Sequence, residues 1–169
     1  MNINDAIKKV EFYIKNPQES LPKETFFFIS RNTPLVNVDL LIKDKNNRVL
    51  LSWRDDKYSG RGWHIPGGIV RYKETFEQRI QKVAINEIGM KVKFDPMPIT
   101  FRQIIIKHRK DRAHFISFLY TCYLDSNIEL QKNKKLKEKQ VGFLKWHDFC
   151  PKNLIKCHKP YEEFINQCL

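Results

Sequence analysis

The sequence predicts a mixed α/β (α+β) sandwich in a single domain. A chain of 169 residues is long enough for one domain with a buried core. Strand-like segments surround one strongly amphipathic helical segment, and further helical patterns lie at both ends of the chain. The chain contains neither a G-x-G-x-x-G motif nor a Walker loop, which disfavours the doubly wound nucleotide-binding folds.

An N-terminal helix is predicted for residues 4–16, and Pro17 directly after this segment is placed to end it. The apolar residues at helical spacing are Ile7, Val10 and Ile14. We expect this helix to precede the core of the domain, which spans about residues 30–150.

Strand-like segments come next along the chain. Residues 24–31 contain the run TFFFIS, which predicts a short strand. Residues 35–43 (LVNVDLLIK) alternate apolar and polar side chains, and residues 48–54 (RVLLSWR) are their expected hairpin partner across the turn signal at 44–47. A further short strand is predicted at 63–66, before a pair of glycines breaks the pattern.

The clearest helix is predicted for residues 75–88. Thr75 is followed three residues later by Gln78, which is a capping-box pattern. Gly89 is placed to end the helix. The apolar stripe comprises Phe76, Ile80, Val83, Ala84 and Ile88.

The second half of the chain alternates strands and loops. Strand-like stretches lie at 91–94, 99–107, 115–124 and 141–146. Residues 147–169 have helical patterns around two prolines and form the expected C-terminal helical segment. All of these elements belong to one predicted domain.

The charge pattern favours an anionic ligand without identifying it. The formal net charge is +12, and a basic surface attracts anions. The densest basic run, KNKKLKEK at 132–139, is typical of a solvated loop and has no aromatic residues interleaved for base stacking. Nucleic acid is therefore disfavoured as a partner.

The location expected from the sequence is the cytoplasm. No apolar run approaches the roughly 18 residues that a membrane span needs, so no membrane partner is expected. Asp5 and Glu11 interrupt any secretory signal. The cysteines form no C-x-x-C pair and match no common zinc spacing, which favours reduced thiols. They are Cys122, Cys150, Cys157 and Cys168.

Residues 67–90 read GGIVRYKETFEQRIQKVAINEIGM, and this segment resembles the Nudix box. That box is a Gly, five residues, a Glu, seven residues, then Arg-Glu-apolar-any-Glu-Glu-any-Gly-apolar. The matching residues are Gly68, Glu74, Ala84, Glu87, Gly89 and Met90. The box is degenerate, because Lys82 replaces the Arg, Val83 the first Glu and Asn86 the second Glu.

A narrower resemblance is to the GDP-mannose mannosyl hydrolase branch of the Nudix hydrolase superfamily. The stretches NTPLVNVDLLI, RVLLSWR and GWHIPGG precede the box as they do in that branch. The resemblance implies a Nudix-type α/β/α sandwich with a mixed sheet and a central loop–helix. It also implies a homodimer and an Mg²⁺- or Mn²⁺-dependent enzyme that hydrolyses a nucleoside diphosphate sugar to sugar and nucleoside diphosphate.

The resemblance also implies roles for particular residues. The metal ligands would be Glu87, the carbonyl oxygen of Gly67 and the side chain of Gln140. Asp39 and Arg54 would serve catalysis and substrate binding, and Arg71 would contact substrate. One carboxylate can suffice, because Mg²⁺ is often held by one or two carboxylates together with water and substrate phosphates.

One departure affects the chemistry directly. The resembled hydrolases carry a catalytic His after the metal-binding Gln, but Val141 occupies that position and cannot accept a proton. His64, His108 and His114 remain as possible bases. Two alternatives stay open: a pyrophosphatase acting on another nucleoside diphosphate derivative, and a catalytically impaired domain that binds nucleotide sugars.

Overall fold

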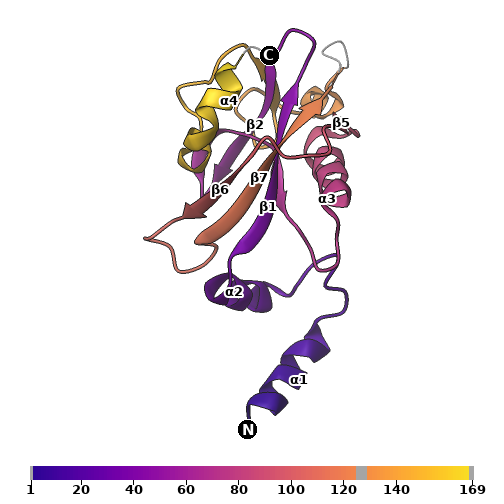
Figure 1. Cartoon of the computed structure of the whole chain (residues 1–169), viewed down its shortest axis with the longest axis vertical. Helices are drawn as coiled ribbons and strands as arrows, with labels where there is room; N and C mark the ends of the chain where they lie inside the picture. Colours follow the sequence, from indigo (N-terminus) through magenta and orange to yellow (C-terminus); the bar gives the residue numbers. More distant parts are fainter. Residues whose placement is uncertain (1, 125–128, 168–169) are drawn as a thin grey trace.

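The structure of the protein is a computed structural model and describes residues 2–124 and 129–167. Within these ranges the strands form one mixed sheet with the order β3-β2-β1-β7-β5 (Figure 1). Strand β4 pairs with β1, β6 with β7 and β8 with β2. The strands are β1 (Leu35–Lys43), β2 (Val49–Asp56), β3 (Gly60–His64), β4 (Gly67–Ile69), β5 (Lys93–Phe94), β6 (Thr100–Ile105), β7 (His114–Tyr123) and β8 (Leu144–His147). The sheet is mixed because β1 runs parallel to β7 and antiparallel to β2.

Helical segments cover both faces of this sheet and confirm the predicted sandwich. They are α1 (Ile3–Tyr13), α2 (Lys23–Asn32), α3 (Phe76–Val83), the π-helix η1 (Ala84–Ile88), the 3-10 helices η2 (Gln131–Lys135) and η3 (Lys156–Tyr161), and α4 (Glu162–Asn166). In β1, Leu40 packs in the core under α3, and the next residue, Leu41, packs in the core under η3 and α4. This alternation follows from the two-residue period of a strand.

The central helix begins as the sequence predicts. The Thr75 hydroxyl accepts a hydrogen bond from the Gln78 N–H at 3.2 Å, and the Gln78 side chain accepts one from the Thr75 N–H at 3.0 Å. The helix ends at Gly89, whose φ of 93° lies in the left-handed region. Its last turn is widened into η1, where the Gly89 N–H contacts the carbonyl of Ala84 at 3.0 Å.

The prediction of a strand at residues 24–31 is wrong. This segment lies in helix α2, with Glu24 in its first turn and Arg31 in its last, which suits the helix dipole. The run TFFFIS has strand propensity, but Phe26, Ile29 and Ser30 recur at helical spacing and face the body of the protein. Tertiary packing of that face overrides the local preference.

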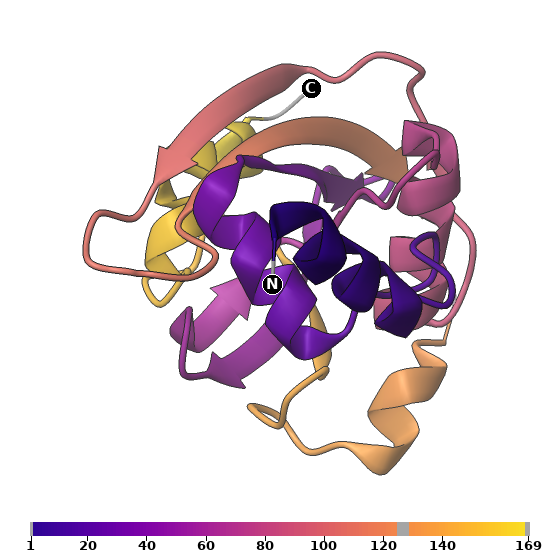
Figure 2. The ribbon, with the colours of Figure 1, turned by 90° about the horizontal axis from the view of Figure 1, so that it is seen from below.

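The predicted N-terminal helix is present as α1, but it ends at Tyr13 rather than at residue 16 before Pro17. It projects from the body beyond α2 and has no buried residue (Figures 1 and 2). Seen from below, α1 and α2 lie across one end of the sheet (Figure 2). No helix in the described part of the chain is long and apolar enough to cross a membrane. Cys122, Cys150 and Cys157 are free thiols, whereas Cys168 lies outside the described residues.

The loop between β4 and α3 is fastened by Glu74. Its carboxylate contacts Arg79 Nη2 at 2.6 Å and Lys82 Nζ at 3.0 Å, and it also accepts the Arg71 N–H at 2.9 Å. Burial alone would raise the pKa of Glu74, but these donors hold it below its usual range. Lys82, which stands where the box has Arg, thus pairs with Glu74, and Arg79 is a second, more buried partner.

The two cations around Glu74 should contribute unequally to stability. The Arg79 side chain is 11% exposed and that of Lys82 is 52% exposed. We expect Arg79→Ala to lower the free energy of unfolding by about 3 kcal/mol, because it strips a nearly buried carboxylate of its main partner. The matched variant Lys82→Ala should lose under about 1 kcal/mol in the same urea titrations.

The difference in unfolding free energy between the wild type and Arg79→Ala should depend on pH. A carboxyl group with a lowered pKa stabilises the fold above its ordinary value of 4.5, and that contribution is lost as the pH falls through the folded-state pKa. The gap between wild type and Arg79→Ala should therefore narrow in acid. Equal losses in the two variants at neutral pH would contradict this account.

Candidate functional site

Two adjoining hollows lie where β1, β2, β3 and β4 meet the end of η1. The first has a volume of about 230 Å³ and extends from Asp39 to the loop between β6 and β7. The second, of about 370 Å³, lies beside Glu87. Arg54, His64 and Arg112 line both hollows, so these three residues mark the place where they join.

The backbone at Gly67 lies between two carboxylates. A Cβ on Gly67 would stand only 2.2 Å from Asp39 Oδ1 and 2.9 Å from the Val38 carbonyl oxygen, so any side chain here is excluded. On its other side, the Gly67 N–H donates to Glu87 Oε1 at 3.3 Å. Gly67 therefore lets β4 approach β1 closely enough to bring both acids to one site.

Asp39 is the buried acid of this site. It lies on β1 and is 2% exposed. The Ser117 hydroxyl donates to Oδ2 at 2.5 Å, and the Asn37 side-chain amide donates to Oδ1 at 2.8 Å. Burial raises the pKa of Asp39 to about 6, against the effect of these hydrogen bonds. Asp39 is thus a stronger base than an ordinary aspartate.

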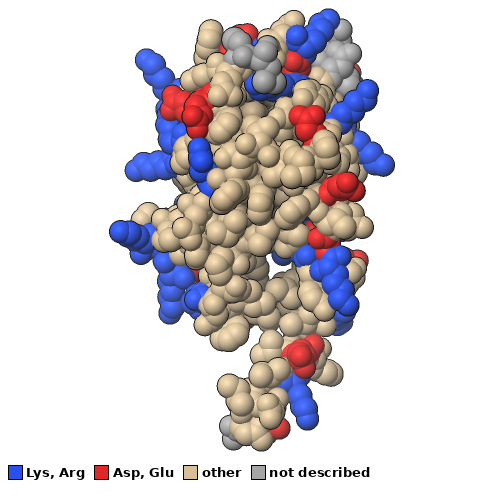
Figure 3. Space-filling view, viewed as in Figure 1, with Lys and Arg blue, Asp and Glu red and all other residues tan. Residues whose placement is uncertain are grey.

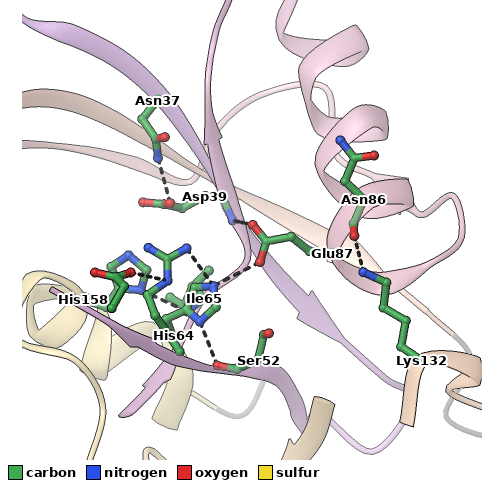
Figure 4. A network of polar contacts seen from close by, with 12 residues as sticks. Asn37, Asp39, Ser52, His64, Ile65, Asn86, Glu87, Lys132 and His158 are labelled. Carbon is green, nitrogen blue, oxygen red and sulfur yellow. Dashed lines mark hydrogen bonds and ion pairs between the residues drawn. The ribbon is translucent and has the colours of Figure 1, made fainter. Parts of the chain in front are cut away.

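Glu87 extends from η1 toward His64 on β3 (Figure 4). His64 Nε2 lies 3.0 Å from Glu87 Oε2 and 3.2 Å from Arg54 Nη2. His64 Nδ1 lies 2.8 Å from the Ser52 carbonyl oxygen, which can only accept, so this nitrogen carries a proton. Burial would raise the pKa of Glu87, but His64 and Arg54 hold it below its usual range.

His158 is a neutral hydrogen-bond donor in the first hollow. Its Nδ1 accepts the Ile65 N–H at 2.9 Å, so the ring proton lies on Nε2. Burial lowers the pKa of His158 well below its ordinary value, and His64 and Arg54 lower it further. His158 belongs to η3, near the C-terminus, and packs beside His64 with ring centroids 6.2 Å apart.

The charge in the hollows is mainly positive. Five arginines line the first hollow, namely Arg54, Arg71, Arg79, Arg109 and Arg112. On the outside of the molecule, by contrast, Lys and Arg side chains are spread around the rim of the face in Figure 3. The arginine-lined hollows are therefore suited to an anionic ligand.

Glu87 is the oxygen donor that could take part in holding an Mg²⁺ ion whose coordination is shared with substrate phosphates. It contacts Gly67 through the Gly67 N–H, whereas the resemblance implies the Gly67 carbonyl oxygen as the metal ligand. The described residues contain no group of three or more His, Cys, Asp and Glu side chains that could hold a metal ion alone. A site with one carboxylate next to Arg54 suits Mg²⁺ when phosphate oxygens and water complete the shell.

Some of the expected site residues lie apart from this arrangement. The amide oxygen of Gln140 accepts the Lys137 N–H at 2.7 Å, and its exposed side chain lines neither hollow. His108 is exposed, and His114 contacts the Gln103 amide at 3.1 Å; neither lines the hollows. Val141 does line the second hollow beside Glu87.

The expected residues Asp39, Arg54, Arg71, Gly67 and Glu87 all lie at the two hollows or contact a residue that does. Sequence reasoning missed His158, because no motif marks the C-terminal segment. It also assigned no role to Arg112, since a basic hairpin tip is more commonly a solvent-facing loop. The signal that could have identified Arg112 is the density of cations between β6 and β7.

Comparisons with known proteins agree with this fold. The chain is 30% identical over 118 residues to the low-salt glycan biosynthesis protein Agl8 of Haloferax volcanii, covering 68% of this chain and 75% of that protein. It is similar in structure to a MutT NUDIX hydrolase from Burkholderia pseudomallei, with a TM-score of 0.62 and 19% identity over 78% of this chain and 97% of that one. A MutT protein from Methanosarcina mazei Go1 gives a TM-score of 0.60 and 15% identity, covering 79% and 94%.

The family follows from the extent of the match. The NUDIX domain profile matches residues 33–167, which contain the whole sheet, the loop–helix and both hollows. The chain therefore adopts the complete fold although its box is degenerate. In this fold the Glu87 side chain lies next to Gly67. The chain belongs to the Nudix family.

Proposed function

We propose that the protein hydrolyses a nucleoside diphosphate sugar, in the manner of the GDP-mannose mannosyl hydrolases that its sequence resembles. The observation that carries this proposal is the arginine-lined pair of hollows with Asp39 and Glu87 on either side of Gly67. The similarity to a protein named for glycan biosynthesis supports a sugar-containing substrate. The homodimer and the cytoplasmic location stay predictions from the sequence.

The two joined hollows support an elongated ligand that carries its negative charge near its middle. The first hollow, about 230 Å³, is smaller than the roughly 300–1,000 Å³ typical of ligand pockets. A nucleotide sugar would need both hollows. Its diphosphate lies between the nucleoside and the sugar, and Arg54 and Arg112 lie where the hollows join. Guanidinium groups can bind phosphate oxygens with two parallel hydrogen bonds.

In the proposed reaction a water oxygen attacks the anomeric carbon of the sugar. The bond from that carbon to the diphosphate oxygen breaks, and the nucleoside diphosphate leaves with the bonding electrons. Arg54 would bind the leaving diphosphate, and Glu87 with the Gly67 carbonyl would hold Mg²⁺. When bound, this ion neutralises charge on phosphate oxygens.

The proton released by the water needs an acceptor in place of a base at Val141. Asp39 is one candidate, because burial raises its pKa to about 6 while leaving it ionised at neutral pH. His64 is the other, since it lines the hollow that Val141 also lines. His108 and His114 lie outside both hollows, which disfavours them in this role.

The bond that breaks can be determined by isotope labelling. In H₂¹⁸O, attack at the anomeric carbon places the label in the free sugar and leaves the nucleoside diphosphate unlabelled. Attack at phosphorus gives a sugar phosphate and a nucleoside monophosphate, one of them labelled. Nucleotide sugars are screened with Mg²⁺ or Mn²⁺, and the masses of the products are measured by mass spectrometry. We expect the label in the sugar. Label in a phosphate group would instead show that the protein is a pyrophosphatase.

Removing the carboxylate of Glu87 should abolish turnover. We expect Glu87→Gln to lower kcat by about 10³-fold or more, because loss of a metal ligand removes charge stabilisation in the transition state. Glu77→Gln, an exposed residue on the same helix, is the matched control and should retain activity. Each variant is compared by initial rates on the best substrate of the screen.

The same variants test the binding of metal. Mn²⁺ should bind weakly to the protein alone and about tenfold or more tightly with a nucleoside diphosphate present, because one carboxylate leaves most of the shell to the ligand. Glu87→Gln should abolish this gain in a calorimetric titration, whereas Glu77→Gln should keep it.

A domain that binds nucleotide sugars without turnover is the second candidate. The observation favouring it is that Val83 is buried in the core and Val141 is exposed beside Glu87, so neither position supplies a carboxylate or base. Tight binding of a nucleotide sugar with no metal-dependent products in the labelling experiment would select this candidate over both hydrolases.

A further inference from the structure

We propose that helix α2, which precedes the part of the chain matched by the Nudix family, belongs to the diphosphate-binding site because it holds Arg112 in place between the two hollows. This inference rests on the proposed function for the identity of the ligand. Helix α2 spans Lys23–Asn32, whereas the family match begins at residue 33. Its contacts with the loop between β6 and β7 are side-chain contacts across 80 or more positions in the sequence.

Helix α2 contacts Arg112 and its neighbour at three points. The buried Ser30 hydroxyl accepts the Arg112 N–H at 3.1 Å while donating its own proton to the Phe27 carbonyl. Arg31 Nη1 lies 2.5 Å from Asp111 Oδ1. The guanidinium of Arg112 lies 6.0 Å from the centre of the Phe26 ring. The loop is thus attached to α2 through two consecutive residues, Asp111 and Arg112.

These contacts support an otherwise unfavourable backbone conformation. Arg112 has a φ of 52°, in the left-handed region that residues other than glycine seldom adopt. Such a conformation is unfavourable for a residue with a side chain and persists where its surroundings fix it. The hydrogen bond from the Arg112 N–H to Ser30 and the ion pair at Asp111 are the contacts that can fix it.

One N–H group of the Arg112 side chain lacks a hydrogen-bond acceptor among the described residues. Its Nε is buried and has no hydrogen-bond partner among the described residues. The guanidinium lies 4.9 Å from the centre of the Tyr58 ring, and Arg112 lines both hollows together with Arg54. Burial lowers the pKa of Arg112, and the nearby charge of Arg54 lowers it further. A bound anion would relieve both effects.

A diphosphate matches this requirement. Arg71 Nε, in the first hollow, is also buried without a partner among the described residues. Two unpaired guanidinium nitrogens, with Arg54 at the junction, need several acceptor oxygens from one compact and multiply charged ligand. Phosphate groups supply them, and a guanidinium fork fits their geometry. The role assigned to Arg112 is to bind the phosphate directly, and the role of α2 is to position Arg112.

The test is calorimetric titration of the full chain with inorganic pyrophosphate in the presence of Mg²⁺. We expect Arg112→Ala to weaken binding about tenfold or more, since charge-assisted hydrogen bonds are lost. Arg31→Ala and Ser30→Ala should weaken it several-fold without altering the cavity walls. Arg102→Ala is the matched control, because Arg102 also makes one partly exposed ion pair, to Glu163, and lines neither hollow.

A double-variant comparison separates positioning from a general loss of stability. If α2 acts through Arg112, adding Arg31→Ala to Arg112→Ala causes no further loss of affinity. Exchanging the charges, with Arg31→Asp and Asp111→Arg together, should restore affinity that either change alone removes. Thermal melts of each variant exclude unfolding as the cause, and Arg112→Lys supplies a second probe of the guanidinium if the alanine variant is unstable.

Three results would overturn the inference: no pyrophosphate binding by the wild type, a loss in Arg31→Ala no larger than in Arg102→Ala, or additive losses in the double variant. Failure of the proposed function looks different. In that case the couplings between Arg31, Asp111 and Arg112 hold for pyrophosphate, yet no nucleotide sugar is hydrolysed in the labelling experiment.

Discussion

The close approach of β4 to β1 at Gly67 is the constraint on which the site depends. Because no side chain fits between Gly67 and Asp39, the two backbones can pair directly. This pairing leads the chain into the loop that Glu74 fastens and then into α3 at a fixed position. The end of that helix brings Glu87 back to the same glycine. Because Gly67 has no Cβ, Asp39 and Glu87, which are far apart in the sequence, can both lie next to its backbone.

The electrostatic balance around these acids determines what the site can accept. Each carboxylate is already engaged: Asp39 by Ser117 and Asn37, and Glu87 by His64 and Gly67. Among the described residues, the arginines of the hollows lack acceptors for some of their donors, as the buried and unpaired Nε atoms of Arg71 and Arg112 show. Such an excess favours ligands that bring their own negative charge, and a metal ion is then accommodated as part of an anionic complex.

Sequence patterns predicted the elements whose signals are local. The capping box at Thr75, the stop at Gly89 and the hairpin strands were readable because neighbouring residues determine them. The segment at residues 24–31 was predicted wrongly, since its helix is selected by packing against a distant loop. The positions of Asp39 and Glu87 followed from a resemblance, whereas those of His158 and Arg112 depend on contacts that no linear spacing encodes.

The widened turn at the end of the central helix has a consequence for which side chains positions 83 and 87 can carry. In a regular α-helix, positions 83 and 87 would lie on one face. Here the π-helical geometry of η1 falls between them, and their surroundings differ: Val83 is 4% exposed within the apolar core, whereas Glu87 extends into the cavity. Replacing Val83 with glutamate would therefore place a charge among hydrocarbon side chains, a change that costs several kcal/mol unless a partner is also supplied. The packing around this position thus opposes a second carboxylate one turn before Glu87.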